Sequence, residues 1–107
     1  MSERRGKYNA KKTEVDGRVF ASRAEARRYS ELCLLEKSGE ISDIECQPLY
    51  QVWITDKHIC NYFADFKYWT KDGVMIVEDV KGVKTPVYRL KKKLVEAQHN
   101  ITITEIT

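Results

Sequence analysis

The stretch Tyr62–Gly82 constrains the fold of this chain most, because it joins two apolar-rich runs through a short turn. Side chains on a strand alternate between faces, and the length of a hairpin loop decides which residues lie opposite each other. A two-residue loop would pair Asp65 with Val80. A three-residue loop that ends at Gly73, with this glycine in the left-handed conformation, would instead pair Asp65 with Asp79.

The three-residue loop, Lys71-Asp72-Gly73, is the one that would create an acidic site. Lys81 lies two residues beyond Asp79 and would share its face. Two carboxylates about 5 Å apart repel by roughly 3 kcal/mol at an effective dielectric constant near 20, and like charges on neighbouring strands destabilise a sheet. A divalent cation would reverse the sign of this interaction. The hairpin therefore predicts a metal site.

Asp65 is followed fourteen residues later by Asp79-Val80-Lys81-Gly82, and this pattern resembles the PD-(D/E)xK signature of restriction-enzyme-like nucleases and Holliday-junction resolvases. Ala64 stands at the position of the proline, which that superfamily can dispense with. The short motif is weak evidence for this superfamily by itself. Its position after a hairpin turn and before a helix makes the resemblance stronger. Nearly the whole chain also resembles small phage-encoded proteins assigned to this superfamily.

The resemblance implies a role for each residue of the motif. Asp65, Asp79 and the carbonyl of Val80 would hold Mg²⁺, for which Mn²⁺ would substitute, because carboxylate, carbonyl and water oxygens suit this ion. Lys81 would orient or deprotonate the attacking water, which makes it catalytic together with the two aspartates. Glu78 alternates to the opposite face and is expected to pair there with a basic side chain.

Glu25 has two interpretations that the sequence leaves open. It lies three residues after Ser22, in the spacing of a capping box, where its side chain would reach back to the Ser22 amide. However, Tyr29 and Leu32 lie on the same helix face, so Glu25 would point toward the sheet. Many superfamily members place a metal-binding or metal-orienting glutamate on the first helix, which supports a catalytic and metal-binding role for Glu25.

The remaining patterns predict one domain over residues 13–107, after a flexible basic tail over 1–12. The expected fold is α/β (α+β), a restriction-endonuclease-like three-layer core in which two helices flank a mixed central sheet, with an N-terminal β-hairpin. The first expected elements are a hairpin that turns at Asp16-Gly17, a helix from Ser22 to Lys37 and a connection over 41–46. Strands over 49–54 and 59–69 and the second strand of the central hairpin follow. The chain is then expected to form a helix from Pro86 to Asn100 and a strand over 101–106. The buried stripe of that helix is expected to be Val87, Leu90, Leu94 and Ala97.

Basic residues gather on both sides of the motif, although the net charge is only +3. A solvated tail or helix face explains either cluster alone, but together, flanking an acidic site, they predict phosphate contacts. Gln47 is a marginal further candidate, since related nucleases sometimes bring a glutamine close to the site. The predicted DNA-binding residues are Arg4, Arg5, Lys7, Lys11, Lys12, Arg89, Lys91 and Lys92.

These features predict a Mg²⁺-dependent DNA endonuclease that hydrolyses phosphodiester bonds. The alternative is a catalytically silent module of the same fold that binds DNA or a protein in a phage replication or recombination complex. A chain of 107 residues is too short for a separate sequence-reading domain, which favours branched, flapped or nicked DNA, the Holliday junction first, cut by a homodimer. No small-molecule cofactor is expected.

The sequence has no apolar stretch of eighteen residues and no apolar signal region near its start. The expectation is therefore a cytoplasmic protein without a membrane partner, located in the host cytoplasm if it is phage-encoded. The three cysteines, Cys33, Cys46 and Cys60, are far apart and lack a C-x-x-C pair, so free thiols are expected.

Overall fold

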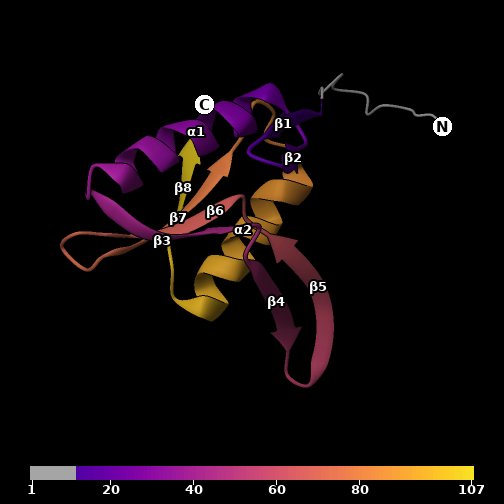
Figure 1. Ribbon diagram of the computed structural model, residues 1–107. Helices are drawn as coiled ribbons and strands as arrows, with labels where there is room; N and C mark the ends of the chain where they lie inside the picture. The colour runs from indigo at the N-terminus through magenta and orange to yellow at the C-terminus, as the bar shows by residue number, and fades with distance from the viewer. Residues whose placement is uncertain (1–11) are drawn as a thin grey trace.

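A computed structural model describes residues 12–107, which form a mixed α and β structure (Figure 1). Within these residues there are two helices, and the strands before, between and after them form three separate sheets. The elements are β1 (Thr13–Val15), β2 (Arg18–Phe20), α1 (Arg23–Lys37), β3 (Ile41–Cys46), β4 (Leu49–Ile54), β5 (Lys57–Phe63), β6 (Phe66–Thr70), β7 (Met75–Val80), α2 (Pro86–His99) and β8 (Ile103–Ile106).

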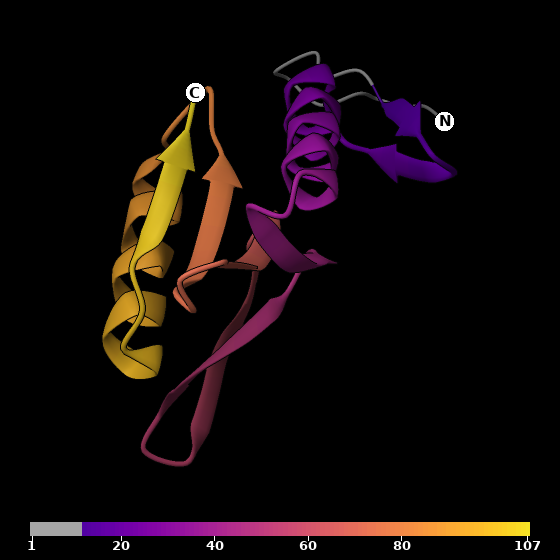
Figure 2. The ribbon, with the colours of Figure 1, turned by 60° about the vertical axis from the view of Figure 1, so that its left-hand side comes forward.

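The central sheet has the strand order β3-β6-β7-β8. Its first three strands are antiparallel, and β8 runs parallel to β7, so the sheet is mixed as predicted. The two helices belong to two different cores: Leu32 of α1 packs with Phe66 and Tyr68, whereas Val95 of α2 packs with Val77. Because successive strand residues face opposite ways, α1 and α2 cover opposite faces of the sheet, as Figure 2 shows. The α+β class, with two helices and a mixed sheet, is confirmed.

The turn between β6 and β7 has the predicted length of three residues. The Thr70 amide donates to the Val74 carbonyl at 2.8 Å, and Gly73 has a φ of +84°, a conformation that glycine adopts without steric cost. Phe66 pairs with Glu78 in the observed register. This is the predicted register over the pairs from Phe66 to Trp69. Asp65 precedes β6 and its amide donates to the Glu78 carbonyl, so the predicted pairing of Asp65 with Asp79 is not among the observed pairs.

The predicted long strand over 59–69 is wrong, because the chain breaks into β5 and β6 at Ala64 and Asp65. The Ala64 amide still donates to the Pro48 carbonyl beside β4, but the Asp65 amide donates to Glu78 in β7. The chain therefore changes partner strand between these two residues. The β4–β5 hairpin consequently leaves the central sheet and projects as an arm (Figures 1 and 2).

Two further expectations need correction. The segment Ile41–Cys46, predicted to be a connection, is strand β3, paired with β6 through an irregular register in which Asp43 has a φ of +57°. In α2 the predicted stripe is wrong at Val87 and Leu90, which are 62% and 59% exposed, and at Ala97, which is exposed as well. Tyr88 and Val95 are buried in their place, so the helix is turned by about one residue from the expected face.

The first helix follows its sequence signals closely. The Ser22 hydroxyl oxygen accepts a hydrogen bond from the Glu25 amide at 3.1 Å, and Gly39 has a φ of +87° just beyond the helix end. The preceding hairpin turns at Asp16-Gly17 as predicted. Cys33, Cys46 and Cys60 are free and half-buried. Within residues 12–107, neither helix has the length and apolar character needed to cross a membrane.

Candidate active site

The start of β6 holds Asp65 rigidly through its backbone. The Asp65 amide donates to the Glu78 carbonyl at 3.0 Å, and its own carbonyl accepts from the Gln47 amide at 2.9 Å. Its side chain is half-buried, and Oδ2 accepts from the Val80 amide at 2.7 Å. Burial raises the pKa of this carboxyl, while the bond from Val80 and the charge of Lys81 lower it.

Asp79 is an acidic residue whose side chain lies in the interior of the protein. Its exposed fraction is 0%, and among residues 12–107 neither of its carboxylate oxygens has a hydrogen-bond partner. Burial raises its pKa from 3.8 to about 6, against the opposing charge of Lys81 and the nearby Asp65 amide. A buried polar group without a partner costs on the order of several kcal/mol, and more when it is charged. Asp79 therefore needs a proton or a cation.

Glu25 reaches the same region from the first turn of α1. Its pKa is raised from 4.5 to about 7, first by burial and then by the negative charges of Asp65 and Asp79, while the Ala21 amide and Lys81 act to lower it. Glu25 thus lies within electrostatic range of both aspartates. The capping bond from its side chain to the Ser22 amide stays a prediction.

Lys81 supplies the cation of this cluster. Its ammonium nitrogen lies 4.7 Å from the centre of the Tyr88 ring, and its amide donates to the Ile106 carbonyl at 2.9 Å. The aromatic face attracts the ammonium and fixes its direction. Its positive charge lowers the pKa of all three carboxyl groups of the cluster.

Tyr88 and Glu105 adjoin the site, and the sequence analysis missed both. The Tyr88 hydroxyl donates to Glu105 at 2.8 Å, and Lys84 forms an ion pair with the other oxygen of that carboxylate at 3.2 Å. Glu105 is opposite Asp79 in the β7–β8 register, and its charge raises the pKa of Asp79. The alternation of the last strand, which places Glu105 in phase with the buried Ile103, was the available signal.

Glu78 faces the other side of the sheet, as predicted. Arg28 donates to both of its carboxylate oxygens, at 2.8 and 2.6 Å, and the Tyr68 hydroxyl donates to the same group. The expected basic partner is therefore Arg28 of α1. These bonds give the buried carboxylate of Glu78 hydrogen-bond partners, whereas the carboxylate of the adjacent Asp79 has none within residues 12–107.

The donor chemistry of the cluster fits Mg²⁺ or Mn²⁺. Carboxylate and carbonyl oxygens are the ligands that these ions prefer, and Mg²⁺ retains several waters, so two or three protein ligands suffice. Asp79 supplies two unpaired oxygens, and the Asp65 amide lies close enough to lower the pKa of this carboxyl. As they stand within residues 12–107, no three His, Cys, Asp or Glu side chains form a group that could hold a metal ion.

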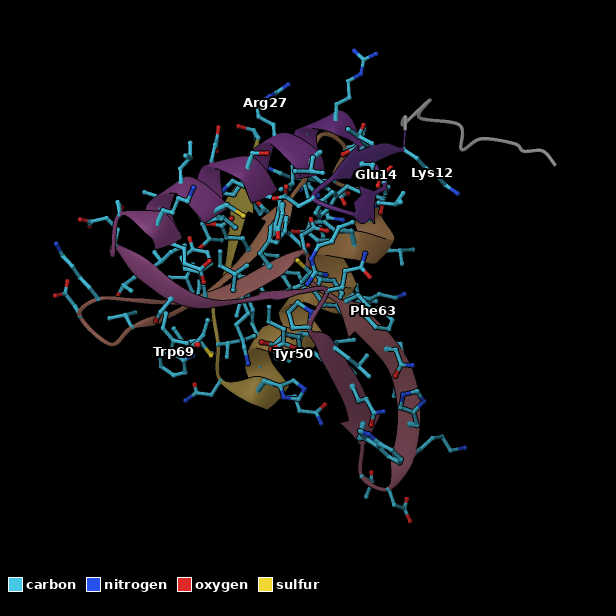
Figure 3. The ribbon with its side chains drawn as sticks, viewed as in Figure 1. Lys12, Glu14, Arg27, Tyr50, Phe63 and Trp69 are labelled. Atoms are coloured by element: carbon cyan, nitrogen blue, oxygen red, sulfur yellow. The ribbon has the colours of Figure 1, made fainter. Side chains whose placement is uncertain are left out.

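The predicted DNA-binding residues are placed unevenly. Arg4, Arg5, Lys7 and Lys11 lie outside the described residues, and Lys12 is exposed beside β1 (Figure 3). In α2, Arg89 is exposed, whereas Lys91 and Lys92 are half-buried. Lys92 forms an ion pair with Glu96 at 3.4 Å and lowers the pKa of Asp79, so it faces the acidic cluster.

Gln47 lies beside the site through its backbone. It is exposed, has a φ of +54°, and its amide donates to the Asp65 carbonyl at 2.9 Å. It also lines a shallow pocket of about 240 Å³ with Arg18, Val19, Phe20 and Cys46.

These features define an α+β domain with a buried acidic cluster where a sheet hairpin meets the first turn of a helix. The chain belongs to the family described as protein of unknown function (DUF1064), whose family model matches residues 5–106. No curated protein and no solved structure matches the chain.

Proposed function

We propose that this protein is a Mg²⁺-dependent DNA endonuclease of the PD-(D/E)xK type, for which Mn²⁺ substitutes. One observation carries the proposal: among residues 12–107, Asp79 is fully buried with both carboxylate oxygens unpaired, near the Asp65 amide and within electrostatic range of Glu25 and Lys81. Such a cluster destabilises a metal-free fold, and a divalent cation would offset both the desolvation and the repulsion. Perturbed carboxyl groups of this kind gather at functional sites.

The cluster is assembled from three elements, which supports a functional rather than a local role. Glu25 comes from α1, Asp65 directly precedes β6, Asp79 lies near the end of β7, and Lys81 directly follows that strand. The mixed sheet with helices on both faces agrees with a restriction-endonuclease-like core, in which the motif occupies this hairpin.

The residues divide the chemistry between them. Asp65, Asp79, the Val80 carbonyl and Glu25 would hold the cation, which when bound supplies charge stabilisation to the phosphodiester undergoing hydrolysis. Lys81 orients the attacking water through its ammonium group, or takes the proton of that water as the neutral amine, and the Tyr88 ring directs its side chain. Arg89, Lys91 and Lys92 of α2, and the basic residues at the start of the chain, would bind the phosphate backbone.

The proposed substrate class follows from the kind of contact that the basic side chains would make. We propose branched, flapped or nicked DNA, because contacts to phosphates position a protein on DNA without reading base edges, and a homodimer would cut two strands. The testing experiment is a gel assay of labelled junction, flap, nicked duplex, plain duplex and single strand with Mg²⁺, Mn²⁺ or EDTA. Cleavage of at least one DNA with metal and of none with EDTA supports the proposal; no cleavage of any DNA overturns it.

A second candidate, a catalytically silent module that binds DNA or a protein, has one observation in its favour. Within the described residues, no three potential metal-ligating side chains are assembled, and Asp65 Oδ2 is already bonded to the Val80 amide. In the same gel assay this candidate gives a shifted band that is never cut. Metal-dependent cleavage would exclude it.

A further inference from the structure

A two-pronged ion pair joins α1 to β7 across the core. Arg28 Nε donates to Glu78 Oε1 at 2.8 Å, and Arg28 Nη2 donates to Oε2 at 2.6 Å. The Tyr68 hydroxyl donates to Oε2 as well. The Glu78 side chain is only 1% exposed, and that of Arg28 is 20% exposed. Two parallel bonds from a planar guanidinium fix direction as well as distance, unlike a single ammonium contact.

Both partners of this pair are neighbours of the acidic cluster. Arg28 lies three residues after Glu25, close to one helical turn, so the two side chains project from adjacent levels of α1. Glu78 directly precedes Asp79 and points to the opposite face of β7. Any sliding or rotation of α1 on the sheet would therefore move Glu25 relative to Asp79.

Stability alone is a weak reason for such a pair. Removing two charges from water costs several kcal/mol per ion, and replacement of a buried pair by apolar side chains of similar volume is often neutral or stabilising. The apolar contacts of α1, through Ala26 and Leu32, already bury the helix against β6. A directional polar contact fixes where the helix lies on the sheet. Nonspecific apolar packing fixes that position less precisely.

We infer that the bracing cluster, Arg28 with Glu78 and Tyr68, positions α1 on β7 so that Glu25 faces Asp65 and Asp79. These three are positioning residues, since none of them is proposed to bind the metal; the negative charge of Glu78 affects the cluster only by raising the pKa of Asp65. The inference rests on the proposed metal-dependent nuclease function and extends it to residues outside the motif. From the sequence alone, a basic partner is expected for Glu78, without a part in the site.

The test separates an effect on the position of α1 from an effect on the stability of the protein. The triple change Arg28→Met, Glu78→Met and Tyr68→Phe removes the polar contact but nearly keeps the volume and leaves no buried charge unpaired. Only the exposed carboxylate of Glu31 loses its ion pair with Arg28. We expect the melting temperature without metal to stay the same or rise. Mn²⁺ affinity, measured by calorimetry, should fall about 10-fold to 100-fold, as for other residues that orient metal ligands, and cleavage should fall with it.

Two single changes calibrate the triple variant. Arg28→Lys keeps the charge but loses the two-pronged geometry, so its Mn²⁺ affinity should lie between those of the wild type and the triple variant. Arg27→Met is the matched control, because Arg27 lies on the outer face of α1 (Figure 3) and should change nothing.

The outcomes are distinct. A triple variant that binds Mn²⁺ and cleaves DNA like the wild type overturns the inference. If it does not fold, Arg28→Lys decides: weaker Mn²⁺ binding at an unchanged melting temperature supports positioning, and unchanged binding overturns it. If the wild type binds Mn²⁺ but cuts no DNA, loss of affinity in the variants still supports positioning while the nuclease proposal fails. If the wild type binds no Mn²⁺, both fail.

Discussion

The substitution Asp79→Asn separates a metal-binding carboxylate from a structural one, because the two roles make opposite demands on stability. The pKa of Asp79 rises from 3.8 to about 6 on folding, chiefly through burial. At about 1.4 kcal/mol for each pH unit, its ionised form destabilises the metal-free protein by about 3 kcal/mol at pH 8. Asparagine removes that charge at nearly constant volume.

The net gain is smaller than this figure, because the new amide group must find acceptors or bear a desolvation penalty of about 1–3 kcal/mol. The charged oxygens of Asp65 and Glu25 lie nearby as acceptors. We expect a net stabilisation of about 1–2 kcal/mol, equivalent to a rise in melting temperature of about 5–10 °C for a domain of this size. Cleavage should fall at least about 100-fold, since metal ions supply several kcal/mol of transition-state stabilisation.

The assay is thermal unfolding in EDTA at pH 8, 5 and 4, paired with cleavage in Mg²⁺. A carboxyl whose pKa is raised on folding destabilises the protein above that pKa, and the penalty declines as the pH falls through it. The ionisation penalty of wild-type Asp79 should therefore fall to roughly half at pH 5 and to about a fifth at pH 4. Because the desolvation penalty of the amide does not change with pH, the net advantage of Asp79→Asn should nearly vanish at pH 5 and reverse at pH 4. Asp72→Asn, in the exposed β6–β7 turn, is the control and should change neither property. An Asp79→Asn variant that is destabilised at pH 8, or one that cleaves at the wild-type rate, would refute the reasoning.

Three further expectations concern the surroundings of Asp79. Glu25→Gln should raise the Mg²⁺ concentration needed for half-maximal cleavage and lower the rate about tenfold or more, as for residues that orient metal ligands; an unaltered requirement and rate would confine Glu25 to capping the helix. The double change Lys91→Ala and Lys92→Ala should weaken binding to all DNA sequences alike and reduce the slope of log affinity against log salt by up to about two; an unchanged slope returns both lysines to a solvated helix face. In EDTA, urea unfolding should show wild-type stability falling as the pH rises from about 4 to 8, because Asp79 and Glu25, with pKa values of about 6 and about 7, hold protons longer in the folded state. Added Mg²⁺ should restore stability at pH 8, and a flat profile would contradict these pKa shifts.

The hairpin could be predicted from the sequence because its determinants are local. Three turn residues ending in Gly73 set the loop, the loop sets the register, and strict alternation then separates Asp79 from Glu78. The caps of α1 are local in the same sense, and Ser22 and Gly39 mark its ends where the structure places them.

The features that escaped prediction depend on tertiary contacts or on interrupted periodicity. The chain exchanges partner strands at Ala64 and Asp65, and no turn residue in the run over 59–69 indicates this break. The irregularity near Asp43 hides the alternation of β3. In α2 the stripe that starts at Val87 is the more apolar one in the sequence. Tyr88 is buried instead, in a hydrogen bond with Glu105, 17 residues away, which the periodicity of the helix does not indicate.

The central claim, that Lys81 and the carboxylate cluster hydrolyse DNA, is tested most directly by the rate of cleavage over a Mg²⁺ titration for the wild type and Lys81→Gln. The change removes the ammonium while keeping Asp65, Asp79 and Glu25 in place, so Mn²⁺ binding measured in parallel should persist. The account predicts saturable, Mg²⁺-dependent cleavage by the wild type and a loss of about 100-fold or more in Lys81→Gln, the effect of removing a group that assists proton transfer. Cleavage by Lys81→Gln at the wild-type rate, or none by the wild type at any Mg²⁺ concentration, would contradict it.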